Sequence, residues 1–161
     1  MGIYTIVVDY SPDSPAKAIA DKSFNISTAD IDAIVKVAKR EKINGIFCAF
    51  EDFNLWNALE LCERLNLPFY ATRKQLEITT NKRYFKKVCK QNGIPVVEEY
   101  YFDEKMTESD INKIRFPVII KPVDSYGSKG ISICYSRDEL KEGYKKAIKY
   151  SRKRSVIVER F

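Results

Sequence analysis

A glycine-rich hairpin with two lysines carries residue types that bind polyphosphates. Residues 116–133, FPVIIKPVDSYGSKGISI, are typical of strand, loop and strand, with Lys121 where the first strand ends. Glycines let backbone N–H groups approach a ligand, serines add hydroxyl donors and lysines add charge. An ammonium about 4 Å from a phosphate charge contributes roughly 4 kcal/mol at an effective dielectric of about 20. The loop residues are Ser125, Tyr126, Gly127, Ser128, Lys129 and Gly130.

The hairpin does not identify a phosphate site without further support. Its spacing is neither GxxxxGK[ST] nor a GxGxxG that opens a helix, so the two familiar nucleotide fingerprints do not apply. A solvated turn would have the same composition. The sequence of the loop alone is therefore compatible with both a phosphate-binding loop and an ordinary turn.

Lys82 is a second candidate for binding an anion. It lies in the first turn of a helix expected over residues 81–91, where a lysine opposes the helix dipole. A bound anion would account for it. The other cations of this helix, Arg83, Lys86 and Lys87, are expected to be solvated.

Two groups of acidic residues follow expected strands. Glu51 and Asp52 come directly after an apolar run, at the edge where open α/β sheets place their sites, but acids ahead of a helix also favour its dipole. Asp9 ends the first apolar run and either contacts a ligand or caps its own turn. Both alternatives remain open for each group.

Composition excludes several kinds of chemistry. The chain of 161 residues contains no histidine, which removes histidine triads, bases and metal sites. The four cysteines, Cys48, Cys62, Cys89 and Cys134, form no CxxC pair and lie in apolar patterns, as reduced core thiols do. A net charge of +6 fits an anionic ligand without identifying it. With no membrane-length apolar run and no leader at the start, the sequence predicts a cytoplasmic protein without membrane contact.

Strands and helices alternate over the first half of the chain, which predicts a small parallel α/β sheet. The expected strands are residues 4–8, 23–26, 46–50 and 69–70. The first two expected helices are residues 16–22 and a helix that begins at Ser27 and Asp30 and ends at Asn44-Gly45. A third helix has Leu55, Ala58, Leu59 and Cys62 on its inward face and closes at residues 66–68. Two further helices are expected to start at Thr72 and Thr80.

The second half surrounds the hairpin with strands and short helices. Beyond the helix over 81–91, the patterns predict strands over 98–102, 118–120 and 131–134 and a strand that enters Glu159. They also predict a helix over 107–114 and a helix capped by Ser136 and Glu139. Basic residues between Lys145 and Arg154 could contact nucleic acid, but no aromatic RNA-binding signature accompanies them. A solvated helix face is therefore expected there.

Four ordered segments resemble the ATP-grasp family, of the carboxylate-amine ligase and carbamoyl-phosphate synthase large-subunit type. They are IYTIVVDYSPDSP from residue 3, NKRYFKKVCKQNGIPV from residue 81, FPVIIKPVDSYGSKGI from residue 116 and VIVERF at residues 156–161. The resemblance implies an α/β fold. Residues 1–80 would form a small parallel, Rossmann-like pre-ATP-grasp domain that is incomplete at its N-terminus, and residues 81–161 a truncated first (α+β) ATP-grasp subdomain.

The resemblance also implies roles for particular residues. Lys82 and Lys121 would contact ATP phosphates, and residues 125–130 would close over them. Glu159 would meet the adenine amino group, and the backbone around Arg160 and Phe161 would read the adenine edge. The family activates a small-molecule carboxylate as an acyl phosphate, which an amine or ammonia attacks, with Mg²⁺ neutralising the phosphates.

The sequence departs from the family pattern at both ends. The usual first strand, glycine-rich turn and helix are absent, and the metal-binding acids and most of the substrate site are expected beyond residue 161, so no metal ligand is assigned in this chain. We therefore expect a fragment with part of an ATP site, which by itself does not turn over ATP. The alternative is a non-catalytic module of a split protein that binds nucleotide or a partner subunit. A sheet edge left open by the absent strand could also pair with a second copy.

Overall fold

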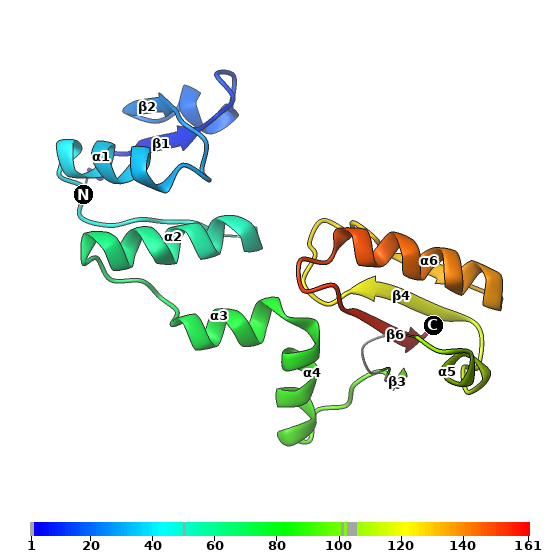
Figure 1. The fold of residues 1–161 in the computed structure, drawn as a ribbon. Coiled ribbons are helices and arrows are strands. Elements are labelled where there is room, and N and C mark those ends of the chain that lie inside the picture. The colour runs from blue at the N-terminus through cyan, green and yellow to red at the C-terminus, as the bar shows by residue number, and fades with distance from the viewer. Residues whose placement is uncertain (1, 50, 101, 103–105) are drawn as a thin grey trace. The chain divides into compact units, whose positions relative to one another are not determined.

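The computed structural model describes residues 2–49, 51–100, 102 and 106–161, and it divides into two compact units, Met1–Leu76 and Glu77–Phe161 (Figure 1). The first unit contains a parallel two-stranded sheet and the second a four-stranded antiparallel sheet. This α/β architecture confirms the predicted fold class. No helix among the described residues is long and apolar enough to cross a membrane.

The first unit pairs β1 (Ile6–Asp9) with β2 (Lys22–Asn25), with Ile6 opposite Lys22 and Asp9 opposite Asn25. Two amphipathic helices follow. These are α1 (Ile31–Glu41), which buries Ile34 and Ala38, and α2 (Asp52–Leu65), which buries Ala58, Leu59, Leu61 and Cys62. Helix α3 (Arg73–Thr80) begins where predicted, after Thr72, whose hydroxyl accepts from the Gln75 N–H.

The ends of α1 differ from the prediction. Asp30, rather than Ser27, is the N-cap, because its carboxylate accepts a hydrogen bond from the Ala33 N–H at 3.0 Å. The helix ends at Lys42, a left-handed residue with φ 52°, before the Asn44-Gly45 pair that was expected to end it. Asn66 ends α2 in the same conformation, at φ 53°, as its position before Leu67-Pro68 predicted.

Three predicted elements of the first unit are wrong. Residues 46–49 and the Phe69-Tyr70 pair form no strand, and Phe50 lies outside the described residues. The helix expected over residues 16–22 is a single 3₁₀ turn, η1 (Pro15–Ala18). Short apolar runs become strands only when a neighbouring strand supplies hydrogen bonds, which explains why the runs at 46–49 and 69–70 misled the prediction.

The second unit is built on a sheet of order β3-β6-β4-β5, with all neighbours antiparallel. Its strands are β3 (Glu99–Tyr100), β4 (Val118–Pro122), β5 (Ser132–Cys134) and β6 (Val156–Arg160). The predicted hairpin is confirmed, because β4 and β5 pair with Ile119 opposite Ile133. The strand expected over 98–102 is limited to two residues, and Tyr101 lies outside the described residues.

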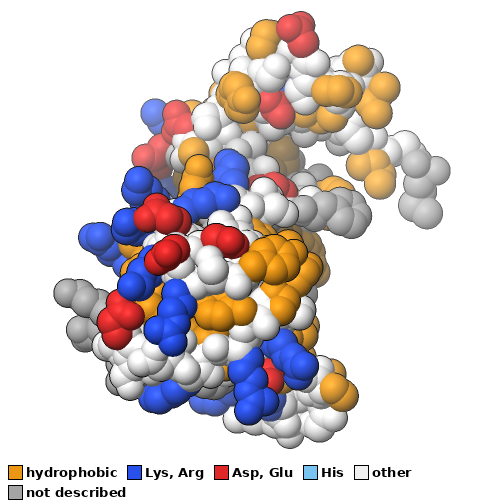
Figure 2. All heavy atoms as spheres, turned by 90° about the vertical axis from the view of Figure 1, so that its right-hand side faces the viewer, with side chains coloured by type: hydrophobic (Ala, Val, Ile, Leu, Met, Phe, Trp, Pro, Cys, Tyr) orange, Lys and Arg blue, Asp and Glu red, His pale blue; other side chains and the backbone are white. Residues whose placement is uncertain are grey.

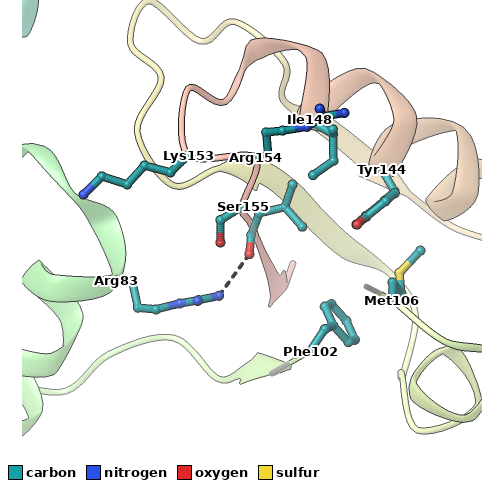
Figure 3. Close-up of a pocket in the computed structure, with 9 residues that line it drawn as sticks. Arg83, Phe102, Met106, Tyr144, Ile148, Lys153, Arg154 and Ser155 are labelled. Atoms are coloured by element: carbon teal, nitrogen blue, oxygen red, sulfur yellow. Dashed lines mark hydrogen bonds between the residues drawn. The ribbon is translucent and has the colours of Figure 1, made fainter. Parts of the chain in front are cut away.

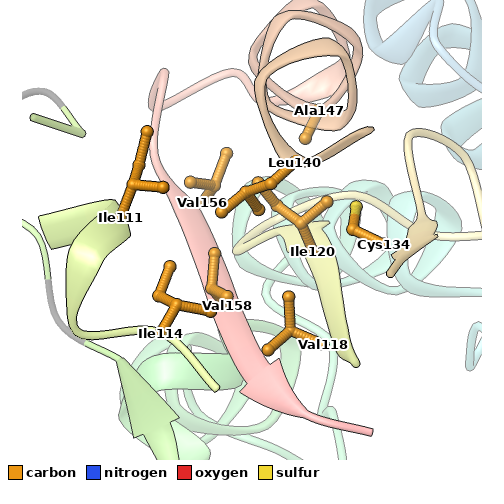
Figure 4. Close-up of a cluster of buried hydrophobic side chains, with 9 residues drawn as sticks. All are labelled: Ile111, Ile114, Val118, Ile120, Cys134, Leu140, Ala147, Val156 and Val158. Atoms are coloured by element: carbon orange, nitrogen blue, oxygen red, sulfur yellow. The ribbon is translucent and has the colours of Figure 1, made fainter. Parts of the chain in front are cut away.

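Helix α6 (Arg137–Tyr150) covers one face of this sheet and closes the main apolar core (Figures 1 and 4). Alternate residues of β4 and β6 point into the core, as a half-buried sheet requires. Gly143 of α6 allows the close contact, since a Cβ there would lie 2.8 Å from Ile120 Cγ2 and 3.1 Å from Cys134 Sγ. The core residues drawn in Figure 4 are Ile111, Ile114, Val118, Ile120, Cys134, Leu140, Ala147, Val156 and Val158.

Side-chain caps fix the starts of the three helices of this unit. Asn81 caps α4 (Lys82–Gln91) by accepting from the N–H groups of Arg83 and Tyr84, so Thr80 is not the cap that was predicted. Thr107 and Asp110 form a capping box at the start of α5 (Glu108–Asn112), within the helix predicted over residues 107–114. Ser136 caps α6, but the Glu139 carboxylate accepts from the Tyr135 N–H.

Candidate functional site

The central pair of the candidate site is Lys121 on β4 and Glu159 on β6. Glu159 lies opposite Ile119, and Lys121 opposite Ile157, so both charged side chains project from the sheet face that α6 does not cover. The Lys121 ammonium lies 2.5 Å from Glu159 Oε2. Lys121 is 21% exposed and Glu159 only 7%, so this is a largely desolvated ion pair within the strands, rather than a lysine at a solvated strand end.

Lys86 and Glu99 extend this pair into a larger group. Lys86 on α4 donates to Glu159 Oε1 at 2.6 Å and lies 3.5 Å from Glu99 Oε2. Glu99 is directly opposite Glu159 in the β3–β6 register, and its side chain is fully buried. The Arg83 Nε lies 3.7 Å from the second Glu99 oxygen. We call these five residues, Arg83, Lys86, Glu99, Lys121 and Glu159, the charge cluster.

Sequence reasoning missed Lys86, which was expected to be solvated but is only 11% exposed. A signal was present, because Lys82 and Lys86 are four residues apart and so share one face of the helix. Their partners could not be identified, since they come from strands that are distant in the sequence.

The ion pairs set the protonation state of Glu159. Burial raises the pKa of the Glu159 carboxyl, but hydrogen bonds from Lys121 and Lys86 outweigh burial and hold the pKa below its ordinary value. The carboxylate is therefore charged at neutral pH. An anion that attracts Lys121 would compete with Glu159 for the same ammonium.

The hairpin between β4 and β5 is tied to the start of α4. The Lys82 ammonium donates to the Ser125 carbonyl at 2.7 Å, and the Lys82 N–H donates to the Val123 carbonyl at 3.1 Å. The Ser125 hydroxyl donates to the Lys129 carbonyl at 2.9 Å, which closes the loop on itself. The structure thus brings both candidate lysines to the base of one hairpin, Lys121 inside its first strand and Lys82 against its loop.

Three positions of the loop have a left-handed backbone conformation. Gly127, Ser128 and Gly130 have φ values of 63°, 56° and 79°. Gly127, Ser128 and Lys129 are exposed, whereas the Tyr126 hydroxyl is buried without a hydrogen-bond partner among the described residues. The tip of the loop is therefore open to solvent.

Gly130→Ala is expected to destabilise this hairpin by about 1–3 kcal/mol. A Cβ at Gly130 would lie 2.8 Å from Pro122 Cγ and 2.9 Å from Tyr150 Cβ, in addition to the strain of its positive φ. Gly127→Ala is the matched control, because its φ is also positive but nothing lies within 4 Å of the added Cβ. Thermal unfolding followed by circular dichroism measures both variants. Equal losses from the two would show that the contacts with Pro122 and Tyr150 contribute nothing.

The chain after Glu159 is held by the sheet. The Arg160 N–H donates to the Glu98 carbonyl at 3.1 Å, and the Phe161 N–H donates to the Pro117 carbonyl at 3.2 Å. Both side chains are exposed. In the stretch whose backbone was expected to read the adenine edge, the N–H groups of Arg160 and Phe161 are therefore used within the protein.

Two of the candidate acidic residues of the first unit, Glu51 and Asp9, bond to the local backbone. Glu51 is the N-cap of α2 and accepts from the Asn54 N–H at 2.8 Å. Asp9 accepts from the Ser11 N–H at 2.7 Å, which closes its own turn. For both positions the structure favours the local role over contact with a ligand.

A pocket of about 230 Å³ opens beside the start of β6, and Arg83 of the charge cluster is among the residues that line it (Figure 3). Phe102, Met106, Tyr144 and Ile148 form its apolar wall, and Lys153 and Arg154 bring positive charge. Arg83 donates to the Val156 carbonyl at 3.1 Å, so one guanidinium borders both the pocket and the cluster.

Two lysines of the basic stretch near the end of α6 are paired or bonded locally. Lys145 pairs with Glu142 at 2.7 Å, and Lys146 donates to the Ile131 carbonyl at 2.8 Å. On the face shown in Figure 2, Lys and Arg side chains are interspersed with Asp and Glu. Across the described ranges, no three Asp, Glu or Cys side chains are grouped to hold a metal ion.

The second half of the chain matches a known family. The family described as "Carbamoyl-phosphate synthase L chain, ATP binding domain" matches residues 81–161. These residues contain α4, the hairpin, α6 and the whole charge cluster.

Curated relatives match the full length of the chain. Formate-dependent phosphoribosylglycinamide formyltransferases from Methanocaldococcus jannaschii and Sulfurisphaera tokodaii are 28% and 30% identical over 165 residues. The matches cover 100% of this chain but 42% and 41% of the relatives. The chain therefore spans less than half the length of these proteins.

Solved structures have the same fold. The biotin carboxylase domain of Hydrogenobacter thermophilus 2-oxoglutarate carboxylase gives a TM-score of 0.80 at 23% identity, over 99% of this chain and 39% of that one. N5-carboxyaminoimidazole ribonucleotide synthetase from Thermotoga maritima gives 0.67 at 25% identity, over 99% and 40%.

Proposed function

Because the chain belongs to the ATP-grasp family of the carbamoyl-phosphate synthase L chain ATP-binding domain, we propose that residues 81–161 bind the phosphates of ATP at the β4–β5 hairpin. The observation that carries the proposal is the desolvated Lys121–Glu159 pair beneath the exposed glycine loop. Lys121 is held by a carboxylate in the absence of ligand, and a phosphate oxygen can replace that carboxylate as its partner.

The loop and Lys82 would complete the phosphate contacts. Backbone N–H groups at the exposed tip, those of Gly127 and Ser128, would meet the outer phosphates. Lys82 links α4 to the loop through the Ser125 carbonyl, so that loop closure and the position of this ammonium are coupled. We place the adenine beside Glu159, with the backbone of Arg160 and Phe161 at its edge.

The reaction that we propose for the whole protein is ATP-dependent ligation of a small-molecule carboxylate to an amine or to ammonia. A carboxylate oxygen would attack the γ-phosphorus and release ADP, giving an acyl phosphate. The nitrogen nucleophile would then attack the acyl carbon and release phosphate. The residues of this chain would contribute by positioning the phosphates and neutralising their charge. The described residues do not fit a Mg²⁺ site, so we assign no step to a metal held by this chain.

We also propose that residues 1–80 form the Rossmann-like domain that precedes the ATP-grasp region in this family. The parallel pairing of β1 and β2 supports this assignment. In the same proposal, a second copy of the chain pairs with the open edge of this sheet.

Lys121→Ala is expected to weaken ATP binding about 10- to 100-fold, because it removes a charge-assisted hydrogen bond of about 1.5–3 kcal/mol. Calorimetric titration with Mg²⁺-ATP and with ADP measures the effect. Lys87→Ala is the matched control, since Lys87 lies on α4 and is exposed. A wild-type chain that binds neither nucleotide, or a Lys121→Ala variant that binds as tightly as wild type, would contradict the proposed site. Binding without turnover would agree with the site and assign ligation to the complete protein.

A further inference from the structure

We propose that Lys86 is a positioning residue: it keeps Glu159 charged and in place when Lys121 leaves that carboxylate for a nucleotide phosphate, and Glu99 holds Lys86 in position. This inference rests on the proposed ATP site. It assigns different tasks to the two lysines that contact the same carboxylate.

The two lysines contact different oxygens of Glu159. Lys86 donates to Oε1 at 2.6 Å, and Lys121 lies 2.5 Å from Oε2. Withdrawal of Lys121 therefore leaves the hydrogen bond to Oε1 intact. The carboxylate keeps one cation and one fixed orientation.

The Lys86 ammonium contacts three acceptors of the protein. Its ammonium has three N–H donors. It meets the Val97 carbonyl at 3.0 Å, Glu159 at 2.6 Å and Glu99 at 3.5 Å. With three protein acceptors around it and a side chain only 11% exposed, Lys86 is not available to follow a phosphate. Lys121 is twice as exposed, at 21%, and lies at the base of the phosphate loop.

Two carboxylates face each other at this point of the sheet, which explains why Lys86 is needed. Glu99 and Glu159 are directly opposite across β3 and β6, and like charges in that position repel. Both Glu99 oxygens are buried and without a hydrogen-bond partner among the described residues, so Glu99 depends on the nearby charges of Lys86 and Arg83. Without Lys86, departure of Lys121 would leave Glu159 buried, charged and beside a second carboxylate, a state that costs a large free energy.

The first test needs no nucleotide, because Lys121→Met imitates the withdrawal of Lys121. Thermal unfolding of the second unit compares Lys121→Met, Lys86→Met and the double variant. We expect Lys86→Met to lower Tm more than Lys121→Met, and the double variant to lose more than the sum of the two. Adding Glu159→Leu to the double variant should recover part of that loss. Equal or larger destabilisation by Lys121→Met alone, or simple additivity, would overturn the proposal.

The second test separates positioning from general stability. ATP draws Lys121 away from Glu159, but adenosine, which has no phosphate, does not. Lys86→Met should weaken ATP binding by about tenfold or more, equivalent to about 1.4 kcal/mol, and adenosine binding clearly less. Lys86→Arg should restore most of the ATP affinity, and the exposed Lys87→Met control should bind both ligands as wild type does.

The outcomes of the two tests distinguish the two proposals. Equal weakening of ATP and adenosine by Lys86→Met would reduce Lys86 to a structural role and overturn the inference. A wild-type chain that binds ATP, with Lys121→Ala weakened but Lys86→Met unchanged, would also overturn it and leave the proposed site standing. If the wild type binds no nucleotide, the proposed site fails, and the unfolding comparison still decides whether Lys86 alone can hold Glu159.

Discussion

Glu159→Gln is expected to lower the free energy of unfolding of the second unit by about 3–5 kcal/mol, because it removes one partner of a buried ion pair and leaves the others uncompensated. Lys86 is only 11% exposed and would keep only the more distant Glu99 as an anionic partner. Hydrogen exchange of the β4 and β6 amides measures the loss. Fluorescence of the one tryptophan, Trp56, would not report it directly, since that residue lies in the first unit.

The control for this variant is Glu142→Gln on α6, where a carboxylate that is 73% exposed pairs with Lys145. The same chemical change there should alter stability by less than about 0.5 kcal/mol. Similar losses in both variants would show that the charge cluster contributes no more than a surface pair.

Acid titration provides a second measurement of the same variant. The folded-state pKa of Glu159 is lowered from 4.5, so its contribution to stability is present above that value and is lost as pH falls through the folded-state pKa. The difference in stability between wild type and Glu159→Gln should therefore shrink below about pH 4.5. A difference that stays constant down to the acid transition would contradict the assigned ionisation.

Leu140→Ala is expected to destabilise the second unit by about 2–5 kcal/mol. Leu140 is fully buried between α6 and the sheet, where it contributes to the cluster that contains Ile120 and Val158 (Figure 4). Truncation removes apolar contacts and leaves a cavity in this close-packed core. Leu140→Met conserves volume and should lose less than about 1.5 kcal/mol. Chemical denaturation followed by circular dichroism compares the two, and equal losses would indicate that the site adapts freely.

Helix periodicity and capping residues made most of the second unit predictable. The Ser136 cap of α6, the Thr107/Asp110 box of α5 and the β4–β5 hairpin are all local patterns, and the structure contains each of them. Residues 46–49 show the limit of such patterns, because an apolar run does not specify a pairing partner. Lys42 shows another, since any residue can end a helix in the left-handed conformation when the following chain requires it.

The candidate site was predictable in its lysines but not in their partners. Lys121 and Lys82 were identified from their positions beside the hairpin and in a first helical turn. The pairing of Glu159 with Lys121 and Lys86 depends on which strands become neighbours, and that information is not contained in either segment alone. Glu99 illustrates the difficulty, because it belongs to a strand of two residues whose burial arises from long-range packing.

The position of β6 in the sheet has a consequence for how the protein is made. β6 lies between β3 and β4, so neither the β3–β6 pairing nor the β6–β4 pairing can form before residues 156–160 have been synthesised. During synthesis, the β4–β5 hairpin and α6 leave the ribosome before the strand that joins them to β3. Sheets that depend on such distant pairings form slowly and expose apolar surface meanwhile. The nascent second unit should therefore expose apolar surface until β6 emerges, whereas β1 and β2 can pair long before.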